Sequence, residues 1–91
     1  MSTFALLYDV VDDFVARRAP LRAEHLALAQ EFRARGELLM GGAFADPVDQ
    51  ALLVFRAPDA SVVERFVARD PYVAHGLVTR WRIRPWTVAV Q

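Results

Sequence analysis

His25 is the one side chain in this sequence that combines titration near neutral pH with a place on an apolar helical surface. Apolar residues recur around it at helical spacing, at Leu21, Leu28, Ala29 and Phe32. An imidazole on such a surface is suited to general acid–base catalysis. The alternative is a core histidine that only bonds to a backbone carbonyl, and the periodicity leaves both interpretations open.

Asp70 is the second candidate for chemistry. A buried carboxylate beside His25 would hold the imidazole in one tautomer and raise its basicity. Asp70 also precedes Pro71, and such a pair commonly begins a short helix, which would end here at Gly76. Because one carboxylate oxygen can cap a helix while the other faces a cleft, the two roles are compatible.

Four further residues could contact a ligand. Arg22 lies three positions before His25, so the two share a helix surface, where the guanidinium could bind a carboxylate or be solvated. Gly41 and Gly42 interrupt a strand pattern, which predicts a β-bulge or the close approach of a ligand to bare backbone. Tyr72, an aromatic residue with a polar tip, is expected in the wall of a cleft.

Composition argues against several other kinds of site. The chain has no cysteine, so disulfides and thiolate metal sites are impossible. Its two serines, two isolated histidines and lack of a glycine-rich phosphate loop predict no nucleophilic triad, metal or cofactor. Zero net charge argues against a nucleic-acid partner. No apolar run is long enough for a membrane span, which predicts a cytoplasmic protein with no membrane partner.

The hydrophobic pattern predicts the elements that must position these residues. The expected strands are Thr3–Asp9, Glu37–Phe44, Gln50–Phe55 and Leu77–Val90, and the expected helices run from Pro20 to about Arg35 and over Asp59–Arg69. A turn or short helical turn is expected over Asp70–Gly76. This β-α-β-β-α-β order predicts one ferredoxin-like α+β domain over residues 1–91, an antiparallel sheet with both helices on one face.

The same pattern predicts self-association. Hydrophobic residues make up 55% of the chain, which is high for a small monomer with a limited core. The first and third strands are apolar on both faces, although helices would cover only one. Because an exposed apolar sheet would aggregate, we expect a two-fold homodimer of stacked sheets with a barrel-like core, or a higher oligomer built from it.

Four stretches of the chain are similar to the YciI-like (YCII-related) proteins. They are Arg22–Leu26 (RAEHL), Gly36–Gly42 (GELLMGG), Asp70–Gly76 (DPYVAHG) and Ile83–Trp86 (IRPW), in the order found in that family. The resemblance implies a dimeric α/β barrel whose active site is a histidine–aspartate pair, here His25 and Asp70. The activity known in that family is dehydrochlorination of a chlorinated hydroxyquinol, and related barrels include muconolactone isomerases; neither fixes the substrate of this chain. The chain departs from the family's pattern at His75.

These observations lead to three functional hypotheses. The first is an enzyme without a cofactor, a lyase such as a dehydrochlorinase or an isomerase, in which His25 and Asp70 move a proton on a small anionic or enolisable substrate. The second is a non-catalytic dimeric module that binds a metabolite in the same cleft. The third is a purely structural dimer in which Asp70 is a helix cap.

Overall fold

The computed structural model describes residues 1–91. In chain order its elements are β1 (Ser2–Val10), α1 (Phe14–Arg17), the 3-10 turn η1 (Ala19–Leu21), α2 (Arg22–Ala34), β2 (Leu38–Ala43), β3 (Gln50–Ala57), α3 (Ser61–Arg69), α4 (Pro71–Ala74) and β4 (Val78–Pro85). The predicted order of strands and long helices is confirmed. None of the helices is long and apolar enough to cross a membrane.

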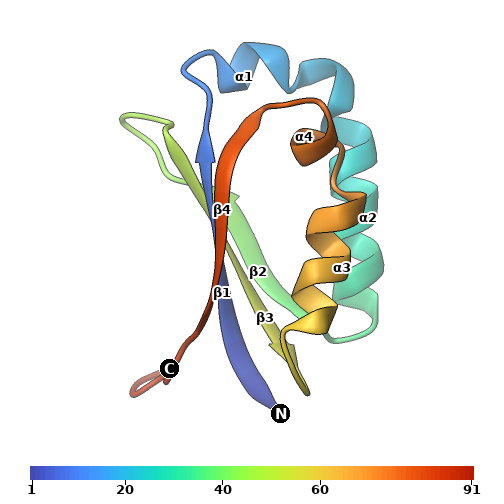
Figure 1. Ribbon diagram of the computed structural model, residues 1–91, viewed down its shortest axis with the longest axis vertical. Helices are drawn as coiled ribbons and strands as arrows, with labels where there is room; N and C mark the ends of the chain where they lie inside the picture. Colours follow the sequence, from blue (N-terminus) through green and yellow to red (C-terminus); the bar gives the residue numbers. More distant parts are fainter.

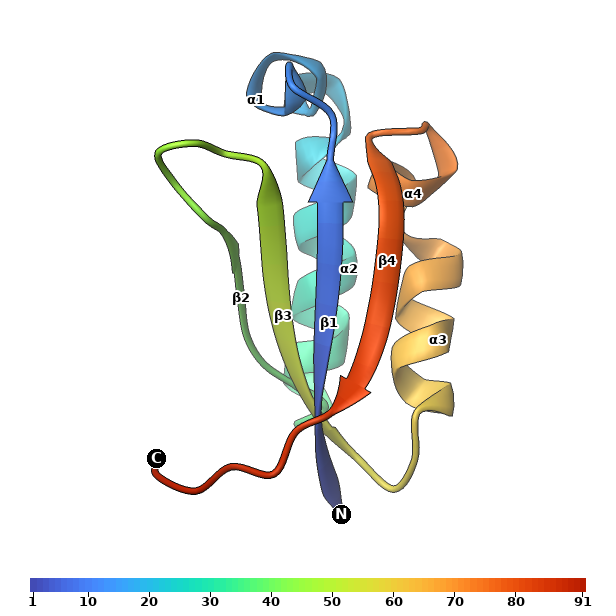
Figure 2. The ribbon, with the colours of Figure 1, turned by 60° about the vertical axis from the view of Figure 1, so that its left-hand side comes forward.

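The four strands form one antiparallel sheet in the order β2-β3-β1-β4 (Figure 2). All the helices lie on one side of this sheet, and the opposite face carries none (Figure 1). β1 and β3 are the two central strands, which explains why each has apolar side chains on both faces. The architecture is the ferredoxin-like α+β fold that the sequence predicted.

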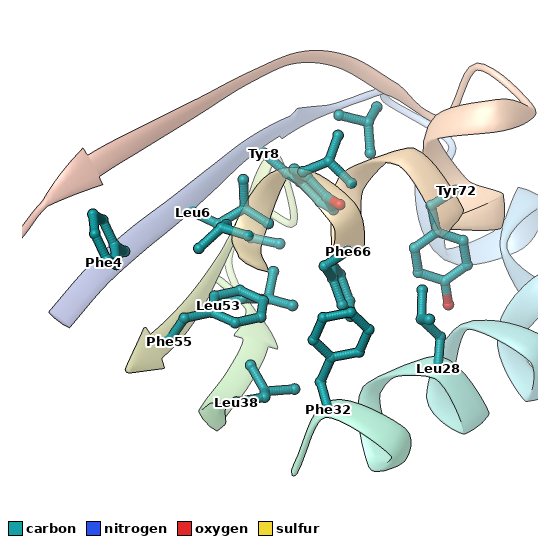
Figure 3. Packing of buried hydrophobic residues seen from close by; sticks show 14 of the residues in the cluster. Phe4, Leu6, Tyr8, Leu28, Phe32, Leu38, Leu53, Phe55, Phe66 and Tyr72 are labelled. Atoms are coloured by element: carbon teal, nitrogen blue, oxygen red, sulfur yellow. The ribbon is translucent and has the colours of Figure 1, made fainter. Parts of the chain in front are cut away.

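The core lies between the sheet and the helices. Along β1, Phe4, Leu6 and Tyr8 are buried there, because successive side chains of a strand point to opposite faces. Phe32 of α2 meets Phe66 of α3 edge to face, with ring centroids 5.2 Å apart, and both contact an aromatic ring of β3 (Figure 3). These contacts fix α2 against the sheet and therefore fix the position of every side chain that α2 carries.

The connection before α2 differs from the prediction. The long helix begins at Arg22, because Pro20 lies in η1, and the short helix α1 was not predicted. The reason is Phe14, which is buried and packs edge to face on the ring of Tyr72 at 5.3 Å. Burying this one aromatic side chain folds the segment back over the end of the core.

The last strand ends at Pro85, and the prediction that it continues to Val90 is wrong. Its partner strand β1 begins at Ser2, and Pro85 already pairs with Phe4. The next backbone bond, from Trp86 N–H to a β1 carbonyl, is the last one between these two segments. Beyond it only Ser2 of β1 remains, which is too little backbone to pair with a strand out to Val90.

Gly41 and Gly42 do not form the predicted bulge. The irregularity in β2 lies between Leu38 and Met40, and the two glycines continue the ladder with β3. A Cβ on Gly41 would lie 3.1 Å from Cγ of Leu53, whereas one on Gly42 would meet open space. Gly41 therefore serves the packing of β2 against β3, a reason that the strand pattern did not reveal.

Candidate active site

Asp70 is the centre of a buried polar cluster. Its side chain is fully buried and lies in the turn between α3 and α4. Oδ1 accepts a hydrogen bond from the backbone N–H of Tyr72 at 3.0 Å, which caps α4. The same oxygen lies 2.8 Å from Nδ1 of His25, and Oδ2 accepts from the hydroxyl of Tyr8 at 2.8 Å. The two roles considered for Asp70 thus coexist, because three donors share its two oxygens.

His25 is held on three sides. Its ring stacks on the ring of Tyr72, with centroids 3.9 Å apart and planes 11° apart, and it meets the edge of Phe66 at 6.2 Å. A carboxylate can only accept, so Nδ1 donates to Asp70 and carries the proton. In the neutral imidazole Nε2 then keeps its lone pair, and no group of the chain bonds to it.

Tyr8 is the member of this cluster that sequence reasoning missed. Burial, followed by the negative charge of Asp70 and the hydrogen bond to it, raises the pKa of Tyr8 far above its usual range. The phenol therefore stays protonated and donates to Asp70 throughout the physiological range. Alternation in β1 indicates that Tyr8 faces the core, but no local signal shows that a carboxylate from another element would meet it there.

A cavity of about 430 Å³ opens beside the cluster, between α2 and β2. His25 and Tyr72 form part of its wall, and the other predicted ligand contacts, Arg22, Gly41 and Gly42, also line it. The chain thus brings all the predicted site residues except Asp70 to one cavity, with Asp70 directly behind His25.

The remaining histidine lies outside the cavity. His75 donates from Nδ1 to the carbonyl of Pro71 at 3.0 Å, so it closes the C-terminal end of α4. No group of three or more histidine, aspartate or glutamate side chains in residues 1–91 is placed to hold a metal ion. His25 is therefore the histidine that lines the cavity, with Asp70 behind it.

Comparison with protein families identifies the chain. The profile of the YCII-related domain matches residues 1–87. The chain belongs to the YCII-related family. This match covers every element described above, including both the helix with His25 and the turn with Asp70. A comparison with curated protein sequences finds no match.

Solved structures similar to this YCII-related protein share its fold. The dehydrochlorinase TftG of Burkholderia phenoliruptrix, which acts on 5-chloro-2-hydroxyhydroquinone and was solved with 2,5-dihydroxybenzoquinone, is 20% identical; the TM-score is 0.77 over 93% of each chain. A NIPSNAP family protein of Agrobacterium tumefaciens is 13% identical, with a TM-score of 0.60 over 93% of this chain and 90% of its own. An antibiotic biosynthesis monooxygenase is 14% identical, with a TM-score of 0.59 over 99% of this chain and 100% of its own.

Proposed function

We propose that this protein is an enzyme of the lyase or isomerase class in which His25 is the general base and Asp70 holds it in place. The observation that carries the proposal is the 2.8 Å contact between Nδ1 of His25 and Oδ1 of Asp70 at the wall of the cavity. A histidine oriented by a buried carboxylate is a recurring arrangement for proton transfer.

The chemistry follows from the free Nε2 lone pair. Nε2 takes a proton from a substrate in the cavity, and the positive charge formed on the imidazole is stabilised by the carboxylate of Asp70. The electron pair left on the substrate either expels a leaving group, which is an elimination, or shifts so that His25 returns the proton at another atom, which is an isomerisation. Arg22, Gly41, Gly42 and Tyr72 are the proposed substrate contacts.

Family membership and fold support this reaction class. The dehydrochlorinase TftG has the same fold over 93% of this chain. Removal of hydrogen chloride is an elimination, so it needs the base that we assign to His25. The substrate of TftG is therefore the first compound to test, together with enolisable lactones as isomerase substrates.

The experiment measures turnover in matched variants. Chloride release from 5-chloro-2-hydroxyhydroquinone reports elimination, and deuterium uptake from heavy water by an enolisable lactone reports proton transfer. We expect His25→Gln and Asp70→Asn to lower kcat by about 10²–10⁴. His75→Gln, at a histidine outside the cavity, should retain activity. Full turnover by His25→Gln would rule the proposal out, and a ligand that binds but is recovered unchanged would favour the binding module.

We also propose that two copies pair through the helix-free face of the sheet. Across β1 and β3, Leu7 lies opposite Leu52 and Ala5 opposite Val54 on that face, and no helix covers them (Figure 1). A second copy presents the same side chains, so a two-fold contact buries both sets. We expect the protein to sediment as a dimer and Leu52→Asp to sediment as a folded monomer, whereas Ala68→Asp on the helical side remains dimeric. A monomeric wild type would contradict this.

A further inference from the structure

The hydroxyl of Tyr72 is the only buried side-chain polar atom in residues 1–91 that has no hydrogen-bond partner. The residue is 3% exposed, and its ring is clamped between Phe14 and the imidazole of His25. Figure 3 shows the hydroxyl end of this ring directed from α4 toward α2. A buried hydroxyl without a partner is destabilising, so its retention here points to a partner that the free chain does not supply.

Charges of both signs act on this hydroxyl, and the arginines act more strongly than the carboxylate of Asp70. Burial raises the pKa of Tyr72, the guanidinium groups of Arg22 and Arg18 act in the opposite direction, and the carboxylate of Asp70 adds a smaller raising effect. Arg22 is exposed and pairs with no carboxylate of the chain, and its guanidinium acts as a donor on the oxygen of the Tyr72 hydroxyl. Both arginines line the cavity, together with Arg33, and no aspartate or glutamate does.

The other two arginines of the cavity are already engaged. Arg33 donates to the carbonyl of Leu39 at 3.1 Å, and the guanidinium of Arg18 lies over the ring of Phe14 at 5.2 Å. Arg22 is therefore the cation that is free to bind a ligand. The nearby rim of the cavity is apolar, with Leu26, Leu39 and Met40 each at least 40% exposed.

We propose that the cavity binds a compact ring-shaped anion whose charged oxygen accepts the hydrogen bond of the Tyr72 hydroxyl and lies against the guanidinium of Arg22. This inference rests on the proposed function because it places the ligand in the same cavity. It adds the class of substrate, which is a carboxylate or a phenolate. The apolar ring of the ligand lies against the apolar rim. Because Tyr72 stacks on His25 at 3.9 Å, an oxygen held by Tyr72 places the ligand beside Nε2.

The test is calorimetric titration with paired probes, which needs no turnover. Benzoate against benzamide tests a carboxylate, and 4-nitrophenolate against 4-nitroanisole tests a phenolate. We expect one anion to bind at least tenfold more tightly than its neutral analogue. Tyr72→Phe and Arg22→Gln should each weaken binding of that anion about tenfold, and leave the neutral analogue unchanged, since each removes one charge-assisted contact. Arg65→Gln, at an exposed arginine of α3 outside the cavity, should have no effect.

The outcomes separate this inference from the proposed function. Selectivity for benzoate assigns a carboxylate, and selectivity for the nitrophenolate assigns a phenolate. Equal binding of charged and neutral probes, or unchanged anion affinity in Tyr72→Phe, overturns the inference. If wild type binds anions no more tightly than neutral probes, the anion site is wrong but the turnover test of His25 still stands. If wild type binds one anion selectively but turns nothing over, the proposed reaction is wrong and the anion site stands. Tyr72→Phe should melt no lower than wild type, because the O–H that it lacks has no acceptor in the free chain.

Discussion

Replacing Asp70 by alanine is expected to cost far more stability than removing a helix cap. The carboxylate receives three hydrogen bonds, from the backbone of Tyr72, from His25 and from Tyr8, and none of its surface is exposed. Hydrogen bonds to a charged group contribute about 1.5–3 kcal/mol each. Even at the lower end of that range, the three together amount to about 4–5 kcal/mol. A cap alone would contribute about 1 kcal/mol.

That loss is large compared with the stability of a domain of this size, which is about 5–15 kcal/mol. We expect Asp70→Ala to lower Tm by roughly 15 °C or more, because each kcal/mol shifts Tm by about 4–8 °C in such a domain. Urea denaturation at neutral pH, followed by circular dichroism, measures the free energy directly. The variant leaves the Tyr8 hydroxyl buried without a partner, which adds to the expected loss.

A matched control separates the buried cluster from ordinary capping. Asp59 accepts one hydrogen bond, from the backbone N–H of Ser61, at the exposed start of α3. Asp59→Ala should therefore retain most of the wild-type stability. If Asp70→Ala costs no more than about 1 kcal/mol, the side chain acts as a cap only and the reasoning about the cluster is wrong. A double-mutant cycle with Tyr8→Phe should show coupling of about 0.5–3 kcal/mol.

Three more predictions follow from other parts of the structure. Burial and the charge of Asp70 raise the pKa of Tyr8, so above pH about 10 this phenol ionises in the unfolded chain and stays protonated in the folded one. Urea melts above that pH should therefore show wild type losing stability more steeply with pH than Tyr8→Phe. Hydrogen bonds from Arg69 and then Arg35 lower the pKa of Glu31 from 4.5 to about 2, so the stability difference between wild type and Glu31→Gln should be present at pH 6 and vanish as the pH falls toward 2. Gly41→Ala, whose methyl group would press on Leu53, should unfold at lower urea than Gly42→Ala, whose methyl group faces open space.

The sequence alone determined the order of the strands and long helices and the faces of the central strands. Alternation and helical periodicity depend on residues a few positions apart, so they can be recognised without knowing the fold. The same local rules place a left-handed residue after the first long helix, and Gly36 has φ of +77° there. They also put His25 on the apolar face of that helix, but they do not show what the imidazole meets.

Only the tertiary structure decided the chemistry of the site. His25 and Asp70 are 45 positions apart in the chain, and Tyr8 and Asp70 are 62 apart. Those contacts depend on how deeply α2 and α4 pack on the sheet, which the aromatic core sets and no local pattern encodes. The unpartnered hydroxyl of Tyr72 is also decided by the tertiary structure. A hydroxyl can be said to have no partner only once packing has fixed all of its neighbours.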